Sequence, residues 1–279
     1  MKSILITGAS SGIGRATSLR LADFGWRIFA TVRNQADGDD LRARLGRRVQ
    51  VVPLDVSQAA SIRDAATQVE QALGGLGLDA LLNNAGIGTV GPVEFTRPET
   101  LRRIFEVNLF GQVEMIQTFL PLVRKARGRI VNIGSVADHV SPPFAGAMAG
   151  SKAAFAAMSS ALRLELRKDG IDVVVIEPGS INTPAATKTL GDVDRVIVEM
   201  PLEGQRRYGE ALRKMAEKFL ASERAGSPPD AVAKVIHKAL RDPRPKARYP
   251  AGKDALKLSL LPRLLPERLV DRLLLKTFG

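Results

Sequence analysis

The chain has 279 residues, of which 45% are hydrophobic and 25% are charged, and this length and balance suit one large folded core. It contains no cysteine, which excludes a disulfide framework and a thiolate metal site, and we expect no metal. Only three apolar residues lie between the first lysine and Thr7. This run is too short for a signal peptide, so a cytoplasmic location is expected.

The net charge of +12 suggests an anionic partner, which could be nucleic acid, a membrane surface or a phosphorylated cofactor. Residues 241–279 hold ten lysines and arginines against four acidic residues, so this tail supplies half of the excess. Neither a recognition helix nor an aromatic RNA-binding signature accompanies the charge, so we expect no nucleic-acid partner.

Apolar strand-like runs alternate with amphipathic helical segments along the chain. Strands are predicted at residues 3–7, 26–32, 49–54, 78–82, 129–133, 171–176 and 247–251. Helices are predicted at residues 13–24, 58–73, 98–123, about 152–168 and 228–240. This alternation predicts an α/β fold in which helices cover both faces of a parallel sheet.

The first strand runs into the glycine-rich turn Gly8-Ala9-Ser10-Ser11-Gly12-Ile13-Gly14 and then into a helix. Glycines let the backbone turn sharply and approach a ligand, and the start of the helix offers unpaired N–H groups to an anion. We therefore expect a cofactor phosphate at Gly8, Ser10, Ser11, Gly12, Ile13 and Gly14. An ordinary strand-turn-helix corner is the alternative, because the spacing differs from the commonest dinucleotide fingerprint.

Motifs over about residues 2–250 resemble the short-chain dehydrogenase/reductase family. They include Thr7 with the glycine spacing, Asp55-Val56, Asn83-Asn84-Ala85-Gly86 and Pro178-Gly179-Ser180-Ile181-Asn182-Thr183. The resemblance implies a Rossmann-type, doubly wound, mostly parallel sheet in a single three-layer αβα domain over residues 1–255. It also implies cofactor contacts at Asp55, Val56, Asn84, Ala85, Gly86, Pro178, Gly179, Ile181 and Thr183. A helix cap is the alternative for Asp55, and a simple Pro-Gly loop is the alternative for the last segment.

The end of the second strand carries Arg33 where an acid would bind the ribose hydroxyl of NAD. A cation here favours the 2′-phosphate of NADP, so NADP is the expected cofactor. Arg15 is a weaker second candidate, and a solvated loop charge is the alternative for Arg33.

The resemblance also implies the catalytic residues. Ser135 is implied to orient the substrate, Lys152 to hold the cofactor ribose, and Asn108 to distort its helix and hold a water that communicates with the lysine. Asparagine is a poor helix former and needs a partner among these apolar neighbours. A solvent-facing side chain is the alternative for Asn108.

One position departs from the family pattern. The catalytic tyrosine is expected thirteen residues after Ser135 and four before Lys152, where this chain has Met148. Residues four apart share a helix face, so a lysine there can lower the pKa of a phenol, but a thioether has no proton to give. Ordinary carbonyl reduction should therefore be about a hundred- to ten-thousand-fold slower. His139, expected at the substrate with Phe144 and Met148, is a weaker candidate for the acid.

Residues 185–226 mix apolar and charged side chains and are predicted to form a mobile lid over a substrate of appreciable volume. The tail at residues 256–279 is leucine-rich and basic, and two prolines, Pro262 and Pro266, are expected to cut it into short pieces. One helical face of the tail must be buried, because it repeats apolar residues at Leu269, Val270, Leu273 and Leu274. Packing on its own domain is favoured over a subunit partner and over an anionic membrane surface.

These features predict an NADP(H)-dependent oxidoreductase, which we expect to be a homodimer or homotetramer. Its substrate is expected to be a medium-sized, largely apolar alcohol or ketone, or an imine or activated alkene that needs little acid help. The rival interpretation is a non-catalytic NADP(H)-binding module or partner subunit, because Ser135, Asn108 and Lys152 also serve the fold and cofactor binding.

Overall fold

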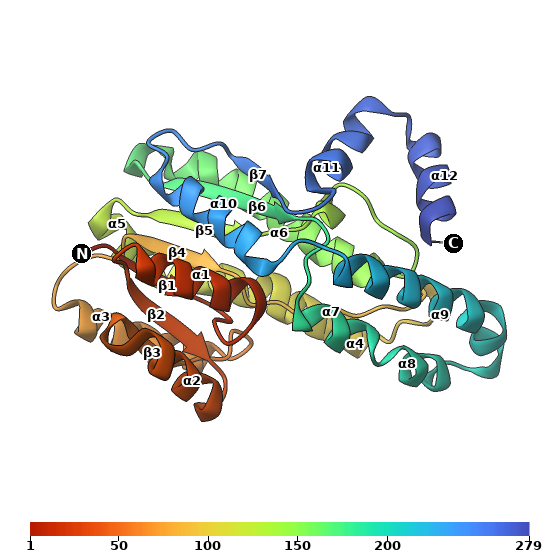
Figure 1. Ribbon diagram of the computed structural model, residues 1–279, viewed down its shortest axis with the longest axis horizontal. Coiled ribbons are helices and arrows are strands. Elements are labelled where there is room, and N and C mark those ends of the chain that lie inside the picture. The colour runs from red at the N-terminus through yellow and green to blue at the C-terminus, as the bar shows by residue number, and fades with distance from the viewer. Residues whose placement is uncertain (279) are drawn as a thin grey trace.

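The computed structural model describes residues 1–278, which form a seven-stranded sheet with every strand parallel to its neighbours. The strand order is β3-β2-β1-β4-β5-β6-β7 (Figure 1). The strands are β1 (Ser3–Ile6), β2 (Arg27–Val32), β3 (Val49–Pro53), β4 (Ala80–Asn83), β5 (Arg129–Ile133), β6 (Asp172–Pro178) and β7 (Arg248–Ala251). The order reverses between β1 and β4, which confirms the doubly wound sheet and creates a crevice at the carboxyl ends of these two strands.

Helices cover both faces of the sheet. One face packs against α1 (Gly12–Asp23), α2 (Gln35–Leu45) and α10 (Pro229–Arg241). The other packs against α3 (Ala59–Leu73), α5 (Gly111–Ala126) and α6 (Gly146–Glu165). Along β1, Ile4 and Ile6 belong to one core and Leu5 to the other, because successive side chains of a strand point to opposite faces. The predicted three layers are therefore confirmed.

Some helices differ from the prediction. Helix α2 was not predicted, because only Gly38 and Leu41 are buried in it and no apolar period marks it. The segment predicted as one helix over residues 98–123 consists of α4 (Pro98–Phe105), a π-helical turn (Glu106–Phe110) and α5. The distortion that the resemblance implied at Asn108 is therefore confirmed. Helix α6 begins at Gly146 instead of near Lys152, so residues 148 and 152 both lie in its first two turns.

The predicted lid region folds into three helices beyond the carboxyl edge of the sheet (Figure 1). They are α7 (Pro184–Leu190), α8 (Val193–Glu199) and α9 (Leu202–Arg224). Their apolar side chains form a cluster of their own with Val90, from the loop after β4. Short 3-10 turns occur at Gly46–Arg48, Val93–Phe95, Val136–Asp138 and Leu166–Asp169.

The tail forms two helices, α11 (Ala255–Leu264) and α12 (Glu267–Phe278). Pro262 lies inside α11, so the expected break at this proline was wrong and the helices separate only at residues 265–266. Val270 and Leu274 of α12 are buried in a cluster with Val140. Leu269 and Leu273, from the same predicted face, stay 42% and 44% exposed. The apolar face of the tail is therefore only partly covered.

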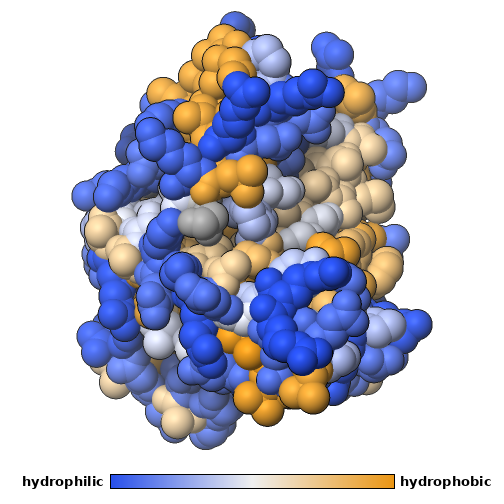
Figure 2. Space-filling model, turned by 90° about the vertical axis from the view of Figure 1, so that its right-hand side faces the viewer, coloured by the Kyte–Doolittle hydropathy of each residue, from blue (hydrophilic) through white to orange (hydrophobic). Residues whose placement is uncertain are grey.

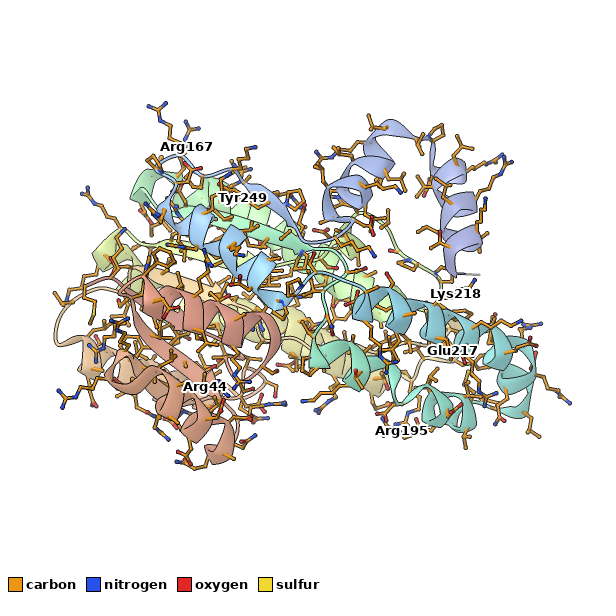
Figure 3. The ribbon with its side chains drawn as sticks, viewed as in Figure 1. Arg44, Arg167, Arg195, Glu217, Lys218 and Tyr249 are labelled. Atoms are coloured by element: carbon orange, nitrogen blue, oxygen red, sulfur yellow. The ribbon has the colours of Figure 1, made fainter. Side chains whose placement is uncertain are left out.

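Positive charge is spread over separate parts of the molecule. Arg44 on α2, Arg167 after α6 and Arg195 on α8 project from three different regions (Figure 3).

Within residues 1–278, no helix has the length and apolar character needed to cross a membrane.

Candidate active site

The glycine-rich turn joins β1 to α1 at the point where the strand order reverses. Gly8 and Gly12 have φ values of +64° and +54°, in the left-handed region that favours glycine. A Cβ on Gly14 would lie 2.3 Å from the carbonyl oxygen of Gly8, so a larger residue does not fit there. The side chain of Ser11 does not cap α1. The first N–H groups of the helix can therefore bind an anion, which suits a cofactor phosphate.

Asn84, just after β4, ties that strand to the glycine-rich turn. Its Nδ2 donates to the carbonyl oxygens of Thr7 at 2.8 Å and Gly8 at 3.1 Å. In return, Thr7 Oγ1 accepts hydrogen bonds from the N–H groups of Asn84 at 2.8 Å and Ala85 at 2.9 Å. These bonds fix the spacing of the crevice between β1 and β4.

We expect Thr7→Val to lower the free energy of unfolding by about 1–3 kcal/mol, because two backbone N–H groups lose their acceptor in a buried place. For a chain of this size the melting temperature should fall by about 2–4 °C for each kcal/mol. Thermal unfolding without cofactor measures the change. Thr17→Val is the matched control, since the buried hydroxyl of Thr17 only donates to Ile13 within α1. Equal losses in the two variants would contradict the prediction.

Asn108 is fully buried in the π-helical turn, so the solvent-facing alternative was wrong. Its Oδ1 accepts the N–H of Ile87 at 2.9 Å, and its Nδ2 donates to the carbonyl oxygen of Ile87 at 2.9 Å. Nδ2 also donates to Ser151 Oγ at 3.0 Å. The amide therefore joins the loop after β4 to α6, the helix that carries Lys152.

Lys152 reaches from α6 to the end of β5. Its Nζ donates to the carbonyl oxygen of Ile133 at 2.7 Å. A Cβ built on Gly86 would lie 3.7 Å from this Nζ and 3.3 Å from Asn108 Oδ1, so the lysine and the asparagine flank the same glycine. Burial lowers the pKa of Lys152 to about 8, although the charge of Asp138 opposes the shift. The ammonium can therefore exchange its proton close to neutral pH.

Ser135 lies two residues beyond Ile133, next to the position that Lys152 reaches. Its Oγ accepts the N–H of Ala137 at 3.0 Å and caps a short turn. The hydroxyl hydrogen can still be donated, because a hydroxyl is donor and acceptor at once. Met148 is half-buried one helical turn before Lys152. Ser135 follows the end of β5, and Met148 and Lys152 lie in α6, so the three residues come to the same edge of the sheet.

His139 was expected to line the substrate pocket, and the structure places it in a charged network. Its Nε2 lies 2.9 Å from Glu177 Oε1 and 3.5 Å from Asp138 Oδ1. Arg248 of β7 donates to Asp138 Oδ2 at 2.9 Å and also to Glu177. The Arg248 guanidinium supplies the positive charge that these two carboxylates need. His139 Nε2 therefore has an acidic partner inside the protein.

The candidate adenosine side of the site contains Arg33 and Asp55. Asp55 accepts hydrogen bonds from the N–H and hydroxyl of Ser57, at 2.9 and 2.7 Å, and does not cap α3, which begins after Gln58. Burial raises the pKa of Asp55, but the bonds from Ser57 and the charges of Arg33 and Arg103 bring it below its usual value. Although Arg33 is exposed, its positive charge therefore interacts with the carboxylate of Asp55.

Arg15, the second candidate for a cofactor phosphate, has a carboxylate partner. Its guanidinium forms an ion pair with Asp40, which also binds Arg44. Of the two candidate arginines, Arg15 is therefore the one held by an acidic partner within the protein.

The segment after β6 contacts both the glycine-rich turn and the lid region. A Cβ on Gly12 would lie 3.4 Å from Thr183, which precedes α7. The N–H of Ile181 donates to Glu223 Oε2 of α9 at 3.2 Å, and Ser180 Oγ lies 3.0 Å from Ser222 Oγ. The segment therefore joins the candidate phosphate site to the last turns of α9.

The sequence profile described as "short chain dehydrogenase" matches residues 2–193. The chain belongs to the short-chain dehydrogenase family. Its relatives include "Retinol dehydrogenase 16" of Mus musculus, which is 36% identical over 284 residues, covering 98% of this chain and 87% of the mouse protein. "NADPH-dependent 3-dehydrocapnine reductase" of Ornithobacterium rhinotracheale is 30% identical over 99% of this chain and 97% of its own. A short-chain dehydrogenase structure from Streptomyces avermitilis has a TM-score of 0.76 and 28% identity, covering 99% and 96% of the two chains.

Tyr208 was not among the expected site residues of this short-chain dehydrogenase. Its ring centroid on α9 lies 6.1 Å from that of Phe144 and 6.0 Å from that of Phe95, both in edge-on contact. The phenol donates to Glu94 at 2.6 Å, and this hydrogen bond raises its pKa. The catalytic tyrosine of the family pattern has its pKa lowered by a neighbouring lysine, whereas the carboxylate of Glu94 raises the pKa of Tyr208. Tyr208 therefore forms part of an aromatic wall and does not replace the missing tyrosine.

Phe144, expected at the substrate, has a φ of +64°. A bulky side chain in this left-handed region costs about 1–3 kcal/mol and persists only where surrounding contacts hold it. Here its carbonyl oxygen accepts the N–H of Gly91 at 2.8 Å, and its ring packs against Tyr208. The loop between Ser135 and Met148 is thus fixed to the loop after β4.

Glu223 was not among the expected site residues either. Its shifted pKa makes the stability of the protein depend on pH. Burial raises its pKa to about 7, while bonds from Ile181 and Ser180 act in the other direction. A carboxyl group with a raised folded-state pKa contributes fully to stability below its unfolded value of 4.5 and loses this contribution as the pH rises through about 7. Glu223→Gln, neutral and still an acceptor, should raise the melting temperature by a few degrees at about pH 8 and change it little at about pH 5.

Differential scanning calorimetry at the two pH values tests this expectation. Glu217→Gln, at an exposed position on the same helix (Figure 3), is the matched control and should give no such difference. A shift of equal size at both pH values would mean that the charge of Glu223 is not responsible.

Proposed function

We propose that this chain transfers hydride between NADP(H) and a medium-sized, largely apolar substrate. The observation that carries the proposal is the position of Lys152, whose Nζ lies 2.7 Å from the carbonyl oxygen of Ile133 and beside Asn108 and Gly86. Two residues beyond Ile133, Ser135 offers a hydroxyl. A lysine and a hydroxyl at one edge of the sheet can hold a cofactor ribose and orient a substrate oxygen.

The residues of the crevice suit a nicotinamide dinucleotide, the cofactor typical of this family. Because the Ser11 side chain leaves the start of α1 uncapped, the first backbone N–H groups of this helix are available to bind a phosphate. Arg33 would bind the 2′-phosphate of NADP, and Thr183 lies beside Gly12 at the candidate phosphate site. When bound, the nicotinamide supplies or accepts the hydride, while Ser135 orients the substrate and Lys152 holds the ribose.

The apolar and aromatic residues of the lid region support an apolar substrate. Phe144, Phe95 and Val90 belong to the apolar cluster of the lid region, and Tyr208 packs on the two phenylalanines. The mouse relative is named for retinol, which is a long apolar alcohol. We propose an alcohol or ketone, or an imine or activated alkene, with ordinary carbonyl reduction impaired because Met148 has no proton to donate.

The alternative function is a non-catalytic NADP(H)-binding module or partner subunit, and the residue that favours it is Met148. Following NADPH absorbance with apolar ketones, retinaldehyde, cyclic imines and enones separates the two functions. Calorimetry with NADPH on the same sample supplies the control for binding. Turnover of any class supports the enzyme. Binding without turnover of any class favours the module, and a failure to bind either NADPH or NADH contradicts both.

A further inference from the structure

The outward side of α11 carries a row of exposed leucines, Leu256, Leu260 and Leu264, which we call the leucine stripe. They recur every four residues and so share one side of the helix. Their exposed fractions are 61%, 36% and 73%. Ala255 and Ser259 of the same helix are buried, so α11 is docked on the domain and the stripe faces outward. Figure 2 shows an apolar patch with hydrophilic borders at the end of the molecule where α11 and α12 lie in Figure 1.

Exposed cations border the leucine stripe on both sides. With 3.6 residues per turn, Arg263 falls on one side of the stripe and Lys257 on the other. Both side chains are exposed, and the sequence of α11 contains no acidic residue. Lys253, just before α11, is exposed as well, next to Asp254.

Helix α12 likewise carries exposed leucines beside basic side chains. Leu269 and Leu273 are partly exposed, and a basic row of Arg268, Arg272 and Lys276 recurs every four residues beside them. Glu267 and Asp271 are the acidic residues of α12. Over residues 253–276 six basic residues stand against three acidic ones, so the two helices together are cationic.

We propose that α11 and α12 dock on the surface of an anionic lipid bilayer, with the leucine stripe at the headgroup boundary and Lys257 and Arg263 against anionic headgroups. A basic amphipathic helix with leucines on one side lies in the plane of such an interface. Each lysine or arginine near an anionic membrane adds attraction that salt weakens. This is attachment to one leaflet and needs no helix that spans the bilayer.

A second copy of this chain suits the leucine stripe less well than a bilayer. A two-fold contact brings the same patch of both copies together, so Lys257 and Arg263 of one copy would lie against Lys257 and Arg263 of the other. Like charges across an interface oppose association. The stripe is also only three side chains, whereas a stable interface takes about 20–30 residues from each partner.

Attachment through the tail would place the lid region near the bilayer. Helix α12 contacts α9, the longest helix of the lid region. If the substrate is apolar, which rests on the proposed function, it partitions into the same bilayer. Vesicle binding requires neither cofactor nor turnover, so its outcome is independent of that function.

Co-sedimentation with vesicles tests the docking surface. The probes are vesicles of phosphatidylcholine with about one-third phosphatidylserine and vesicles of phosphatidylcholine alone, each at low and high salt. We expect the full chain to sediment with the anionic vesicles and to bind them several-fold more weakly at high salt. Replacing two leucines (Leu256→Ser with Leu264→Ser) should weaken partitioning about tenfold or more. Replacing the cations (Lys257→Gln with Arg263→Gln) should weaken it on anionic vesicles only.

Controls outside the tail separate the stripe from general effects. Leu76→Ser changes a leucine that is 69% exposed in the turn after α3, and it should leave partitioning unchanged. Thermal unfolding of each variant should match that of the parent, because the replaced side chains are exposed. Lack of sedimentation, equal binding to the neutral vesicles or an equal loss in Leu76→Ser overturns the proposal. So does a dimer in sedimentation velocity that the leucine variant abolishes, since the stripe then serves a second copy.

Discussion

Met148→Tyr is expected to create or raise alcohol and ketone oxidoreductase activity, with turnover increasing by about a hundredfold or more. The new phenol would stand one helical turn before Lys152, whose positive charge favours the phenolate. Ser135, at the end of β5, can share the substrate oxygen with it. Methionine and tyrosine differ in shape, so some repacking against Phe144 is expected. The measurement is NADPH-dependent reduction of a panel of apolar ketones.

Met148→Phe is the matched control, because it introduces the same ring without the hydroxyl. Both variants should bind NADPH as the parent does in calorimetry, and only the tyrosine variant should gain turnover. Normal NADPH binding without any gain would favour the module. Rapid ketone reduction by the parent would mean that another acid acts, and His139→Ala would then test whether that acid is His139. An equal gain in Met148→Phe would show that shape, and not proton donation, limits the parent.

The sheet could be predicted from the sequence because each strand is a short apolar run between turn residues. Both faces of a doubly wound sheet are covered, so the strands need no alternation to be recognised. Helix α2 was not predicted because it buries so few side chains. The π-helical turn at residues 106–110 leaves no mark on the apolar periodicity, so only the resemblance at Asn108 pointed to a distortion there. The start of α6 was missed because Gly146, Ala147 and Ala149 carry no apolar period or cap.

In the candidate site, residues that belong to local motifs could be predicted, and residues whose partners lie far along the chain could not. Thr7, Asn84 and Lys152 lie in local motifs, and the structure brings their elements to one edge of the sheet. Tyr208 and Glu223 lie in a helix whose sequence shows only an amphipathic pattern, so nothing local reveals that they reach Phe144 and Ile181. His139 was interpreted from its spacing to Ser135, but Glu177 and Arg248, which surround it, come from strands far along the chain. Long-range polar partners of this kind leave no periodic signal.

Arg33→Ala is expected to lower the affinity for NADP about ten- to hundredfold and to leave the affinity for NAD nearly unchanged. A charge-assisted contact between a guanidinium and a phosphate is worth about 1.5–3 kcal/mol, which corresponds to this range. Arg33 follows β2 directly, where an acid would repel the 2′-phosphate, and its charge already contributes to the lowered pKa of Asp55. Calorimetric titration of parent and variant with each cofactor measures both affinities.

Arg15→Ala is the control for Arg33→Ala, because it removes a nearby guanidinium that is paired with Asp40. It should change the ratio of the two affinities much less. The preference of the parent should also shrink at high salt, since Arg33 is exposed and its charge is screened. Equal affinity of the parent for NADP and NAD, or a ratio that Arg33→Ala leaves untouched, would show that the cation after β2 is only a solvated loop charge. A ratio that falls in Arg15→Ala alone would instead assign the phosphate to Arg15 after release from Asp40.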